Sequence, residues 1–139
     1  MKKTVIKIVE DYLKSNPNAI FVTADLGFGA IENIKENHSR QFINAGISES
    51  NTILMATGLA LNGHEVIIYS IGNFISLRVV EFLRNGPLYH NLKITIIAVG
   101  AGFSYGQLGF THHLTEDISV MRALPNIEVY SCADPIEAE

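Results

Sequence analysis

The sequence predicts an α/β fold with a doubly wound, mostly parallel sheet and helices on both faces. Two observations carry this prediction. Short apolar runs rich in β-branched residues alternate along the chain with stretches typical of helices. Glycine-bearing loops follow several of these runs, and in such sheets ligands bind beyond the carboxyl ends of the strands. No repeat, low-complexity tract or linker interrupts the 139 residues, so we expect a single domain over residues 1–139.

The first half of the chain predicts a helix, two strands and a second helix. Their expected spans are, in order, about 5–14, 19–24, 41–45 and 49–61. Apolar residues recur at helical spacing between Val5 and Leu13, with charged residues between them. The first strand run is apolar and rich in β-formers, as in a strand covered on both faces. Gly46 begins the turn into the second helix, and Asn62-Gly63 ends that helix.

The second half predicts strands and helices in alternation, with a long loop over 100–111. The expected spans are a strand at 65–71, a helix at 75–83, a strand at 93–99, a helix at 115–124 and a strand at 127–130. The run 93–99 is the clearest candidate for a buried strand. Thr115 is expected to cap its helix, and Glu116 and Asp117 suit the first turn because carboxylates stabilise a helix N-terminus.

Composition and charge exclude several classes of protein. With 47% hydrophobic and 17% charged residues, the chain is too apolar to remain disordered. A net charge of −4 argues against binding to nucleic acid or to an anionic membrane surface. The single cysteine, Cys132, has no partner for an internal disulfide and is expected to be a small buried hydrophobic residue. Charges interrupt the N-terminal apolar stretch, and no run of about 18 apolar residues occurs, so we expect a cytoplasmic protein without a membrane span.

Three segments carry residues suited to chemistry. Gly100, Gly102 and Gly106 nearly match a dinucleotide-binding fingerprint, but the third glycine is one residue late, which favours a flexible loop or a loop that lines another ligand. His112-His113 lacks further metal-binding residues at suitable spacing, so no metal site is predicted. Glu49 begins a helix after a glycine turn. It is either an acid that stabilises the helix dipole or a partly buried functional carboxylate.

Five stretches recur in a fixed order and spacing that belongs to a known family. They are RQFINAGISESN at 40–51, MATGLA at 55–60, GFTHHLTEDI at 109–118, MRALPN at 121–126 and DPIE at 134–137. Together they resemble the pyrimidine-binding domain of transketolase-like thiamine diphosphate enzymes, which include transketolase, deoxyxylulose-phosphate synthase and the β subunit of pyruvate dehydrogenase. With Thr23-Ala24-Asp25-Leu26 and the segment around Phe74, the resemblance covers roughly residues 19 to 137.

The resemblance implies roles for four residues, of which Glu49 and His112 are the expected catalytic residues. Glu49 matches the glutamate that hydrogen-bonds a ring nitrogen of the cofactor's aminopyrimidine and so promotes loss of the thiazolium proton. Phe74 matches an aromatic residue stacked over that ring, with core packing as the alternative. Asp25 matches an acidic residue near the cofactor, with capping of its glycine loop as the alternative. His112 matches a histidine at the substrate end, where it exchanges protons with a carbonyl or hydroxyl group.

The resemblance also implies that thiamine diphosphate is shared with a partner chain. The family binds the diphosphate and Mg²⁺ through another domain that carries a G-D-G…N motif, and no G-D-G occurs here. We therefore expect a separate diphosphate-binding subunit that holds the Mg²⁺, a homodimer or higher assembly, and transfer of a two-carbon ketol or acyl unit between small carbonyl compounds or sugars. Gly29, Gly100 and Leu108 replace polar residues that recognise sugar phosphates, so a pentose phosphate substrate is not implied.

Two other functional classes remain as alternatives. One is a non-catalytic interaction module that keeps the fold, and the other is a free-standing flavodoxin-like nucleotide binder. The length bears on the question, because Asp134-Pro135 predicts the start of a helix but only four residues follow Pro135. Either the natural chain is a minimal split-off subunit or this sequence is part of a longer one. Both cases predict an incompletely covered sheet edge or face and hence a tight partner.

Overall fold

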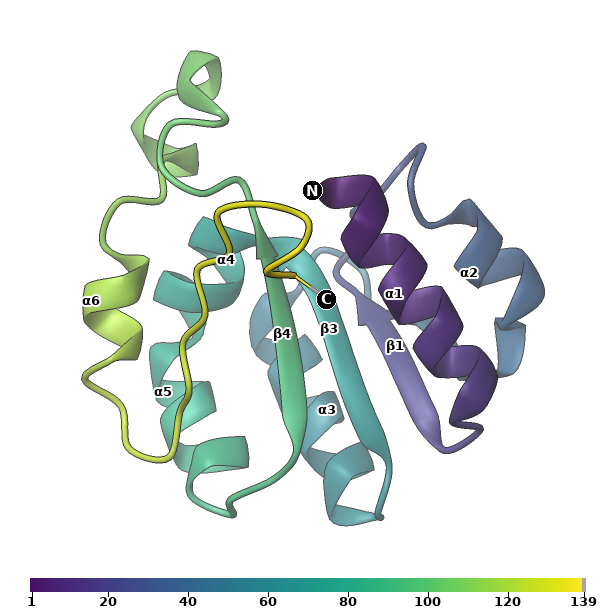
Figure 1. Ribbon diagram of the computed structural model, residues 1–139. Helices are drawn as coiled ribbons and strands as arrows, with labels where there is room; N and C mark the ends of the chain where they lie inside the picture. Colours follow the sequence, from purple (N-terminus) through teal and green to yellow (C-terminus); the bar gives the residue numbers. More distant parts are fainter. Residues whose placement is uncertain (139) are drawn as a thin grey trace.

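The structure, a computed structural model that describes residues 1–138, contains one sheet of four parallel strands in the order β2-β1-β3-β4 (Figure 1). The strands are β1 (Ala19–Thr23), β2 (Phe42–Asn44), β3 (Glu65–Ile71) and β4 (Ile94–Val99). The chain leaves β1 on one side to form β2, then crosses back to form β3 and β4 on the other side. This reversal confirms the predicted doubly wound sheet and places the topological switch point between β1 and β3.

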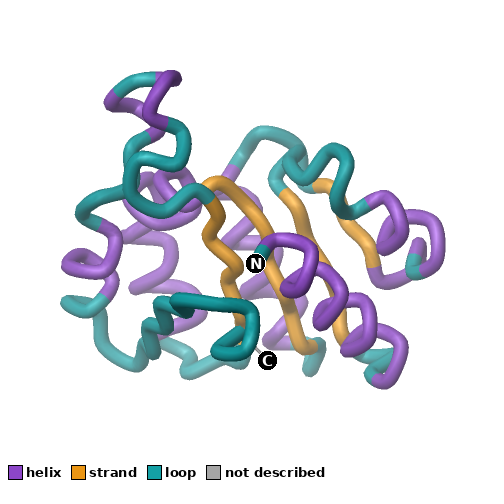
Figure 2. The backbone as a smooth tube through the Cα atoms, turned by 45° about the horizontal axis from the view of Figure 1, so that its top comes forward, coloured by secondary structure: helices purple, strands orange, loops and turns teal. Residues whose placement is uncertain are grey.

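Helices cover both faces of the sheet, as predicted (Figures 1 and 2). One face is covered by α1 (Lys2–Ser15) and α2 (Glu32–Asn37), and the other by α3 (Glu49–Leu61), α5 (Val80–Leu83) and α6 (Asp117–Met121). The helix α4 (Gly72–Ser76) follows β3 directly. The remaining turns are the 3₁₀ segments η1 (Ser39–Gln41), η2 (Leu77–Val79), η4 (Gly106–Leu108) and η5 (Phe110–His112), and the π turn η3 (Arg84–Leu88).

The strand β1 lies between two hydrophobic clusters because successive side chains of a strand point to opposite faces of the sheet. All of its residues are buried. Phe21 belongs to the cluster under α1 and α2, where its ring centroid lies 6.1 Å from those of Phe42 and Tyr69. Ile20 and Val22 belong to the cluster under α3. The expectation of a strand covered on both faces is confirmed for this run.

In contrast, β4 is an edge strand, so the prediction for 93–99 is correct in type and wrong in burial. It pairs only with β3, in register from Val66–Ile94 to Ile71–Val99, and the side chains of Thr95 and Ala98 are exposed. An apolar run indicates a strand but does not say whether a neighbour lies on each side of it. The outer N–H and C=O groups of β4 have no strand partner within residues 1–138.

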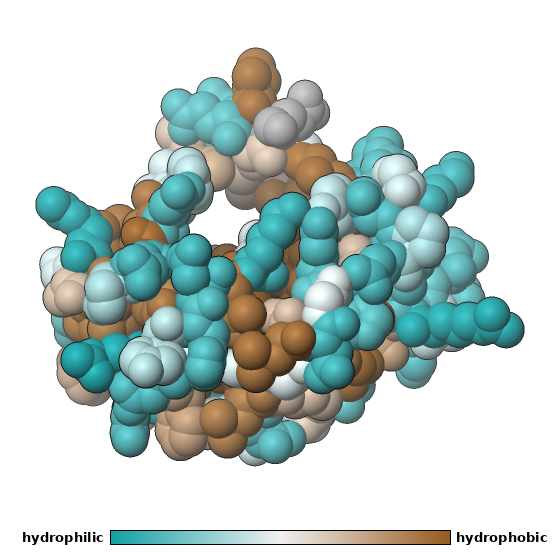
Figure 3. All heavy atoms as spheres, turned by 90° about the horizontal axis from the view of Figure 1, so that it is seen from below, coloured by the Kyte–Doolittle hydropathy of each residue, from teal (hydrophilic) through white to brown (hydrophobic). Residues whose placement is uncertain are grey.

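No strand forms over 127–130 in the described part of the chain, and the sequence prediction for these residues is wrong. A strand needs a neighbour to satisfy its backbone hydrogen-bonding groups, and none pairs with this run. The C-terminal segment, residues 128–138, instead runs as a coil past β4 (Figure 1). Seen from below, an open gap separates this segment from the body of the molecule, with apolar side chains on its rim (Figure 3).

The C-terminal segment has two further features that bear on the sequence predictions. Asp134 caps the turn that follows it, because its Oδ1 accepts the backbone N–H groups of Ile136 at 2.8 Å and of Glu137 at 3.0 Å. The predicted capping role of Asp134 is therefore confirmed. Cys132 is exposed rather than buried, because the strand expected to carry it into the core does not form.

Three helical segments differ from expectation. The helix predicted over 75–83 starts at Gly72 and is divided into α4, η2 and α5. The helix predicted over 115–124 is the shorter α6, whose N-cap is Glu116, while the hydroxyl of Thr115 donates to Glu116 Oε2 over 3.0 Å instead of capping the helix. The helix α2 has no counterpart in the sequence prediction, because a single buried side chain, Ile34, is too little to establish a helical period.

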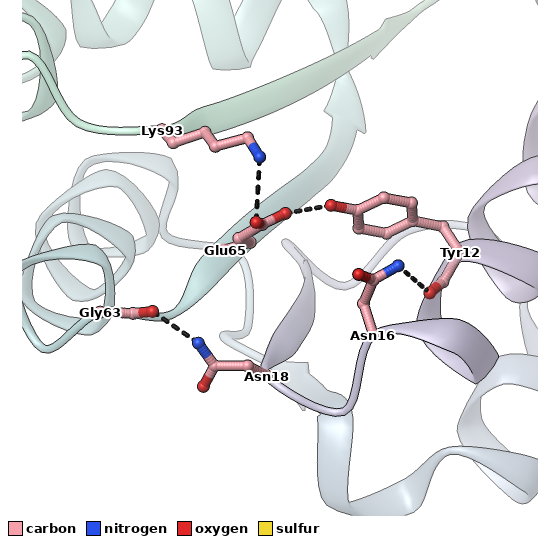
Figure 4. A network of polar contacts seen from close by, with 6 residues as sticks. All are labelled: Tyr12, Asn16, Asn18, Gly63, Glu65 and Lys93. Atoms are coloured by element: carbon pink, nitrogen blue, oxygen red, sulfur yellow. Dashed lines mark hydrogen bonds and ion pairs between the residues drawn. The ribbon is translucent and has the colours of Figure 1, made fainter.

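A polar network joins several elements at the amino ends of the strands (Figure 4). The Tyr12 hydroxyl of α1 donates to one carboxylate oxygen of Glu65, and Lys93 Nζ donates to the other over 2.9 Å. Asn18 Nδ2 donates to the Gly63 carbonyl over 2.6 Å, which joins the loop before β1 to the loop after α3. The hydrogen bonds from Tyr12 and Lys93 lower the pKa of Glu65, and the same carboxylate raises the pKa of both donors.

We expect Tyr12→Phe to lower the melting temperature at neutral pH, and we expect this loss to shrink in acid. The pKa of Glu65 is lower in the folded protein than its ordinary value of 4.5. Its contribution to stability is therefore present above that ordinary value and disappears as the pH falls through the lower folded value. Thermal unfolding of both proteins between neutral pH and about pH 3 measures the difference.

The matched control is Tyr130→Phe, which removes a tyrosine hydroxyl that also donates to a glutamate, Glu128, but on the C-terminal segment that stands off from the sheet. This variant should melt like the parent protein at every pH. A loss for Tyr12→Phe that stays constant down to acid pH would contradict the assignment of Glu65 as the titrating acceptor.

Candidate functional site

All four predicted site residues lie on segments that leave the carboxyl ends of the strands, at the top of Figure 1. Asp25 follows β1, Glu49 follows the turn after β2, Phe74 lies in α4 after β3, and His112 lies in η5 after β4. Because the strands are parallel, their carboxyl ends share one edge. The topology therefore brings these segments to the same side of the molecule.

The turn after β2 places Glu49 at the first residue of α3, as predicted. Gly46 adopts φ +74°, a conformation that glycine reaches without strain, and its N–H donates to Asn44 Oδ1 over 3.0 Å. The Ser48 carbonyl accepts both the N–H and the hydroxyl of Thr52, each over 2.9 Å, and so starts the helix. The Glu49 side chain is only 3% exposed, so an ionised carboxylate there needs a donor from within the protein.

Arg78 supplies this donor and also covers Phe74. Its Nη1 donates to Glu49 Oε2 over 2.5 Å, a charge-assisted hydrogen bond. The guanidinium carbon also lies 4.5 Å from the centroid of the Phe74 ring, within cation–π range. A single flat, positively charged group therefore contacts both Glu49 and Phe74, although these two residues come from different elements.

His112 contacts the same aromatic ring from the loop after β4. Its ring lies edge-on to Phe74, with centroids 5.1 Å apart and an interplanar angle of 69°. Thr111 Oγ1 lies 3.0 Å from His112 Nδ1. Asn73 Nδ2 donates to the carbonyl of His113 over 2.5 Å and ties this loop to α4. Glu49, Phe74 and His112, which the family resemblance assigns to one site, thus form one cluster with Arg78.

The long loop after β4 is held down at its base by Leu114. Two backbone hydrogen bonds, of 2.8 and 2.9 Å, join Leu114 and Gly102, and the Leu114 side chain is buried. Gly72 makes room for it, because a Cβ at that position would lie 2.2 Å from Leu114 Cδ2. The lack of a side chain at the start of α4 therefore allows the loop that carries His112 to close onto α4.

A cavity of about 320 Å³ adjoins the cluster. It is lined by Asn73, Phe74, Leu77, Arg78, Phe110, Thr111, His113 and Glu116. The lining combines apolar surface with a few polar and charged groups, as small-molecule sites do. One wall comes from α4 and η2, and the other comes from the loop after β4 and the approach to α6.

Asp25 lies apart from this cluster. Asn44 Nδ2 donates to Asp25 Oδ1 over 2.9 Å, and the Asp25 N–H donates to Asn44 Oδ1 over 3.1 Å. This reciprocal pair holds Asp25 at φ +53°, a conformation that is uncommon outside glycine. Asp25 lines a second cavity, of about 130 Å³, beside Phe28. The contacts support its alternative role as a stabiliser of the glycine loop, and its role near a cofactor stays a prediction.

Arg78 and Asn73 belong to the cluster, although the sequence analysis does not single them out. Arg78 stands four positions after Phe74, and side chains at this spacing share a helix face, so an aromatic residue followed by a cation was the available signal. Asn73 has no such signal. Its contact with His113 depends on how the loop after β4 folds back over α4, which no local pattern encodes.

Tyr69 contributes a buried hydroxyl beneath this edge of the sheet. Its side chain packs beside Phe21, and its hydroxyl has no hydrogen-bond partner within residues 1–138. Burial, with a smaller effect of nearby Tyr105, raises the pKa of Tyr69 to about 12. The group is therefore neutral at physiological pH, and it does not contribute a charge to the site.

Two negative findings apply to the described residues 1–138. No three histidine, cysteine, aspartate or glutamate side chains come together in an arrangement that would hold a metal ion. No helix combines the length and the apolar character that crossing a membrane requires.

Comparison with known sequences points to one family. The family described as transketolase, pyrimidine binding domain, matches residues 1–139. A protein of Methanocaldococcus jannaschii named as a putative transketolase C-terminal section is 36% identical over 133 residues, which are 95% of this chain and 41% of that protein. One of the named subunits of the apulose-4-phosphate transketolase of Actinobacillus succinogenes is 35% identical over 104 residues, 75% of this chain and 33% of that protein.

A solved structure agrees with these sequence matches. It is described as a split gene transketolase in an inactive beta4 tetramer, and it superposes with a TM-score of 0.85 at 28% identity. The match covers 98% of this chain and 43% of that one, so the chain spans less than half the length of these relatives. From its fold, from the order of its motifs and from a match along its whole length, the chain belongs to the transketolase pyrimidine-binding domain family.

Proposed function

We propose that this chain is the pyrimidine-binding half of a split, thiamine diphosphate-dependent transketolase that transfers a two-carbon ketol or acyl unit between carbonyl compounds. The observation that carries the proposal is the pairing of a buried carboxylate, Glu49, with an exposed aromatic face, Phe74, through one flat N–H donor. An aminopyrimidine is also a flat group with N–H donors and suits the same two contacts.

The residues fit this part of the cofactor. Glu49 is nearly inaccessible to water, so a proton placed between it and a ring nitrogen is shared rather than lost to solvent. The guanidinium of Arg78 serves as a stand-in, since it hydrogen-bonds to Glu49 and covers Phe74 at the same time. When bound, thiamine diphosphate would supply the carbanion chemistry, and the protein would supply orientation and protonation.

Each residue of the cluster has a distinct proposed task. Glu49 holds a proton at the ring nitrogen, and Phe74 fixes the plane of the ring. His112 is tied to Phe74 by their edge-on contact and stands on the substrate side, where it would exchange a proton with a carbonyl or hydroxyl oxygen. Asp25 would act more remotely, by fixing the loop after β1 through Asn44.

The loop after β4 supports a substrate other than the usual sugar phosphates. Sugar-handling relatives carry a histidine at the position of Gly100. Here a Cβ at that position would lie 2.2 Å from the ring of Tyr105, and φ is +91°, so only glycine fits without a rearrangement. Tyr105 therefore occupies the space in which a polar side chain would recognise the sugar, and we propose a small carbonyl compound or a modified sugar as substrate.

A separate diphosphate-binding subunit is proposed to complete the site and to hold the Mg²⁺. Four large apolar side chains on the loops at the carboxyl edge are exposed: Phe28, Ile47, Phe103 and Phe110. Exposed aromatic and aliphatic groups around a binding site are typical of a surface that another chain covers. The apulose-4-phosphate transketolase relative and the split gene transketolase are themselves parts of multi-chain enzymes by name. A cytoplasmic, oligomeric enzyme is the proposed setting, which suits an exposed free thiol at Cys132.

We expect Glu49→Gln to lower kcat at least about 100-fold in the assembled enzyme, because proton transfer by a positioned acid contributes about 10²–10⁴-fold. The measurement is ketol transfer by this chain mixed with a diphosphate-binding chain of the G-D-G…N type, in the presence of thiamine diphosphate and Mg²⁺. The substitution preserves shape, so assembly should be unchanged.

Glu81→Gln is the matched control, because Glu81 is an exposed glutamate in the first turn of α5, on the other side of η2. This variant should turn over like the parent. Near-parental turnover by Glu49→Gln would remove the proton-holding role of Glu49 and favour a non-catalytic assembly module instead.

We expect the double substitution Phe28→Ser and Phe110→Ser to weaken association with the partner subunit at least about tenfold, because buried aromatic anchors dominate interface energies. Both side chains are about four-fifths exposed, at 81% and 79%, so the stability of the isolated chain should hardly change. Analytical ultracentrifugation of the mixture measures the association.

Tyr89→Ser provides the control, because Tyr89 is 76% exposed but follows η3 at the amino end of β4, away from the site. It should leave association unaffected. Equal weakening by the two variants would mean that apolar exposure in general, rather than the carboxyl edge, drives assembly.

A further inference from the structure

The guanidinium of Arg78 lies where the proposed function requires a ligand. Its Nη1 is 2.5 Å from Glu49 Oε2, and its central carbon is 4.5 Å from the Phe74 ring centroid. These are the two protein contacts that the aminopyrimidine is proposed to make. A guanidinium is planar, delocalised and rich in N–H donors, so it matches both the carboxylate and the aromatic face in shape and charge.

The two ends of this ion pair differ strongly in exposure. The side chain of Glu49 is 3% exposed, whereas that of Arg78 is 48% exposed. Arg78 thus reaches in from the solvent side, and rotation of its flexible side chain would withdraw the guanidinium without unfolding η2. Withdrawal leaves the Glu49 carboxylate buried and unpaired, which is costly unless another N–H donor takes the vacated place.

The surroundings leave space for such an exchange. The cavity of about 320 Å³ lies directly beside Phe74 and Arg78. Its opposite wall includes the carboxylate of Glu116, which offers an acceptor for a displaced guanidinium. His112 contacts the edge of Phe74 and leaves the face under Arg78 to the guanidinium.

We propose that Arg78 is a built-in occupant of the pyrimidine half-site, which pairs with Glu49 and covers Phe74 until the cofactor displaces it. The inference rests on the proposed function, because it identifies the Arg78 position with that of the ring. Arg78 keeps the buried carboxylate paired in the cofactor-free chain and lowers the apparent affinity for the ring by the fraction of molecules in which it is withdrawn. It also acts in specificity, since a flat ligand without an N–H donor cannot replace it against Glu49.

The test uses this chain alone, with the isolated pyrimidine 4-amino-5-hydroxymethyl-2-methylpyrimidine as the probe, because this probe needs no diphosphate-binding partner. In the nuclear magnetic resonance spectrum of the free chain, the Arg78 side-chain protons should be shifted upfield by the Phe74 ring. Addition of the probe should move them to the positions of a solvated arginine. Titration calorimetry should show about tenfold tighter probe binding to Arg78→Ala, as expected if Arg78 is withdrawn in about a tenth of the molecules.

Two variants control this experiment. Arg84→Ala removes a neighbouring exposed arginine whose guanidinium contacts Asn85, and it should bind the probe like the parent chain. Arg78→Lys keeps the charge opposite Glu49 but loses the planar group, so it should fold even if Arg78→Ala does not, and it should bind the probe more tightly than the parent. Unfolding of Arg78→Ala alone leaves the displacement readout in the parent chain and the titration of Arg78→Lys to decide.

The outcomes separate this inference from the proposed function. Probe binding that Glu49→Gln abolishes, with unshifted Arg78 protons or with equal affinity in the parent, Arg78→Ala and Arg78→Lys, would overturn the role of Arg78 and leave the pyrimidine site intact. Weaker binding to both Arg78 variants would also overturn it, since Arg78 would then hold the ligand rather than compete with it. No probe binding to the parent or to any variant would overturn both proposals together.

Discussion

The parallel pairing of β1 with both β2 and β3 is the constraint on which the rest of the structure depends. Because all four strands run in the same direction, the turn that begins α3, the start of α4 and the loop after β4 leave the sheet at the same edge. Glu49, Phe74 and His112 are far apart in the chain, and nothing local brings them together. The burial of β1 on both faces fixes this arrangement, since a slip of one residue would exchange Phe21 with Ile20 and Val22 between the two clusters.

The buried carboxylate imposes the second requirement on the site. Glu49 gains its isolation from water by sitting at the base of the edge, under the turn that Gly46 and Asn44 shape. Isolation is useful for holding a proton at a defined atom, but it is unfavourable for a charge without a partner. A resident donor reconciles the two demands in the free protein. The same carboxylate then selects for ligands that bring their own donor, so stability in the empty state and recognition in the filled state rely on one atom.

The sequence predicts the elements that local chemistry determines. The span of α3 is predicted at both ends, because Gly46 and Asn62-Gly63 are strong turn signals. Asp134 is predicted as a cap because its carboxylate accepts the N–H groups just after it in the chain. The grouping of Glu49, Phe74 and His112 comes from the family resemblance, since composition and periodicity carry no information on contacts across the fold. Arg78, Asn73 and the isolation of Asp25 emerge only from the packing of α4 against its neighbours.

The remaining errors arise where an element depends on a neighbour. The apolar run of β4 is typical of a strand between two others, yet the structure describes one on only one side, and the run at 127–130 has none. The consequence is a gradient of local stability across the sheet. Amide protons of β1, buried and bonded on both sides, should exchange with solvent only through global unfolding, while the outer amides of β4 are open from the start. Glu49 is thus anchored beside the rigid centre, and His112 hangs from the strand that opens most readily, so the two ends of the site differ in intrinsic mobility before any ligand or second chain arrives.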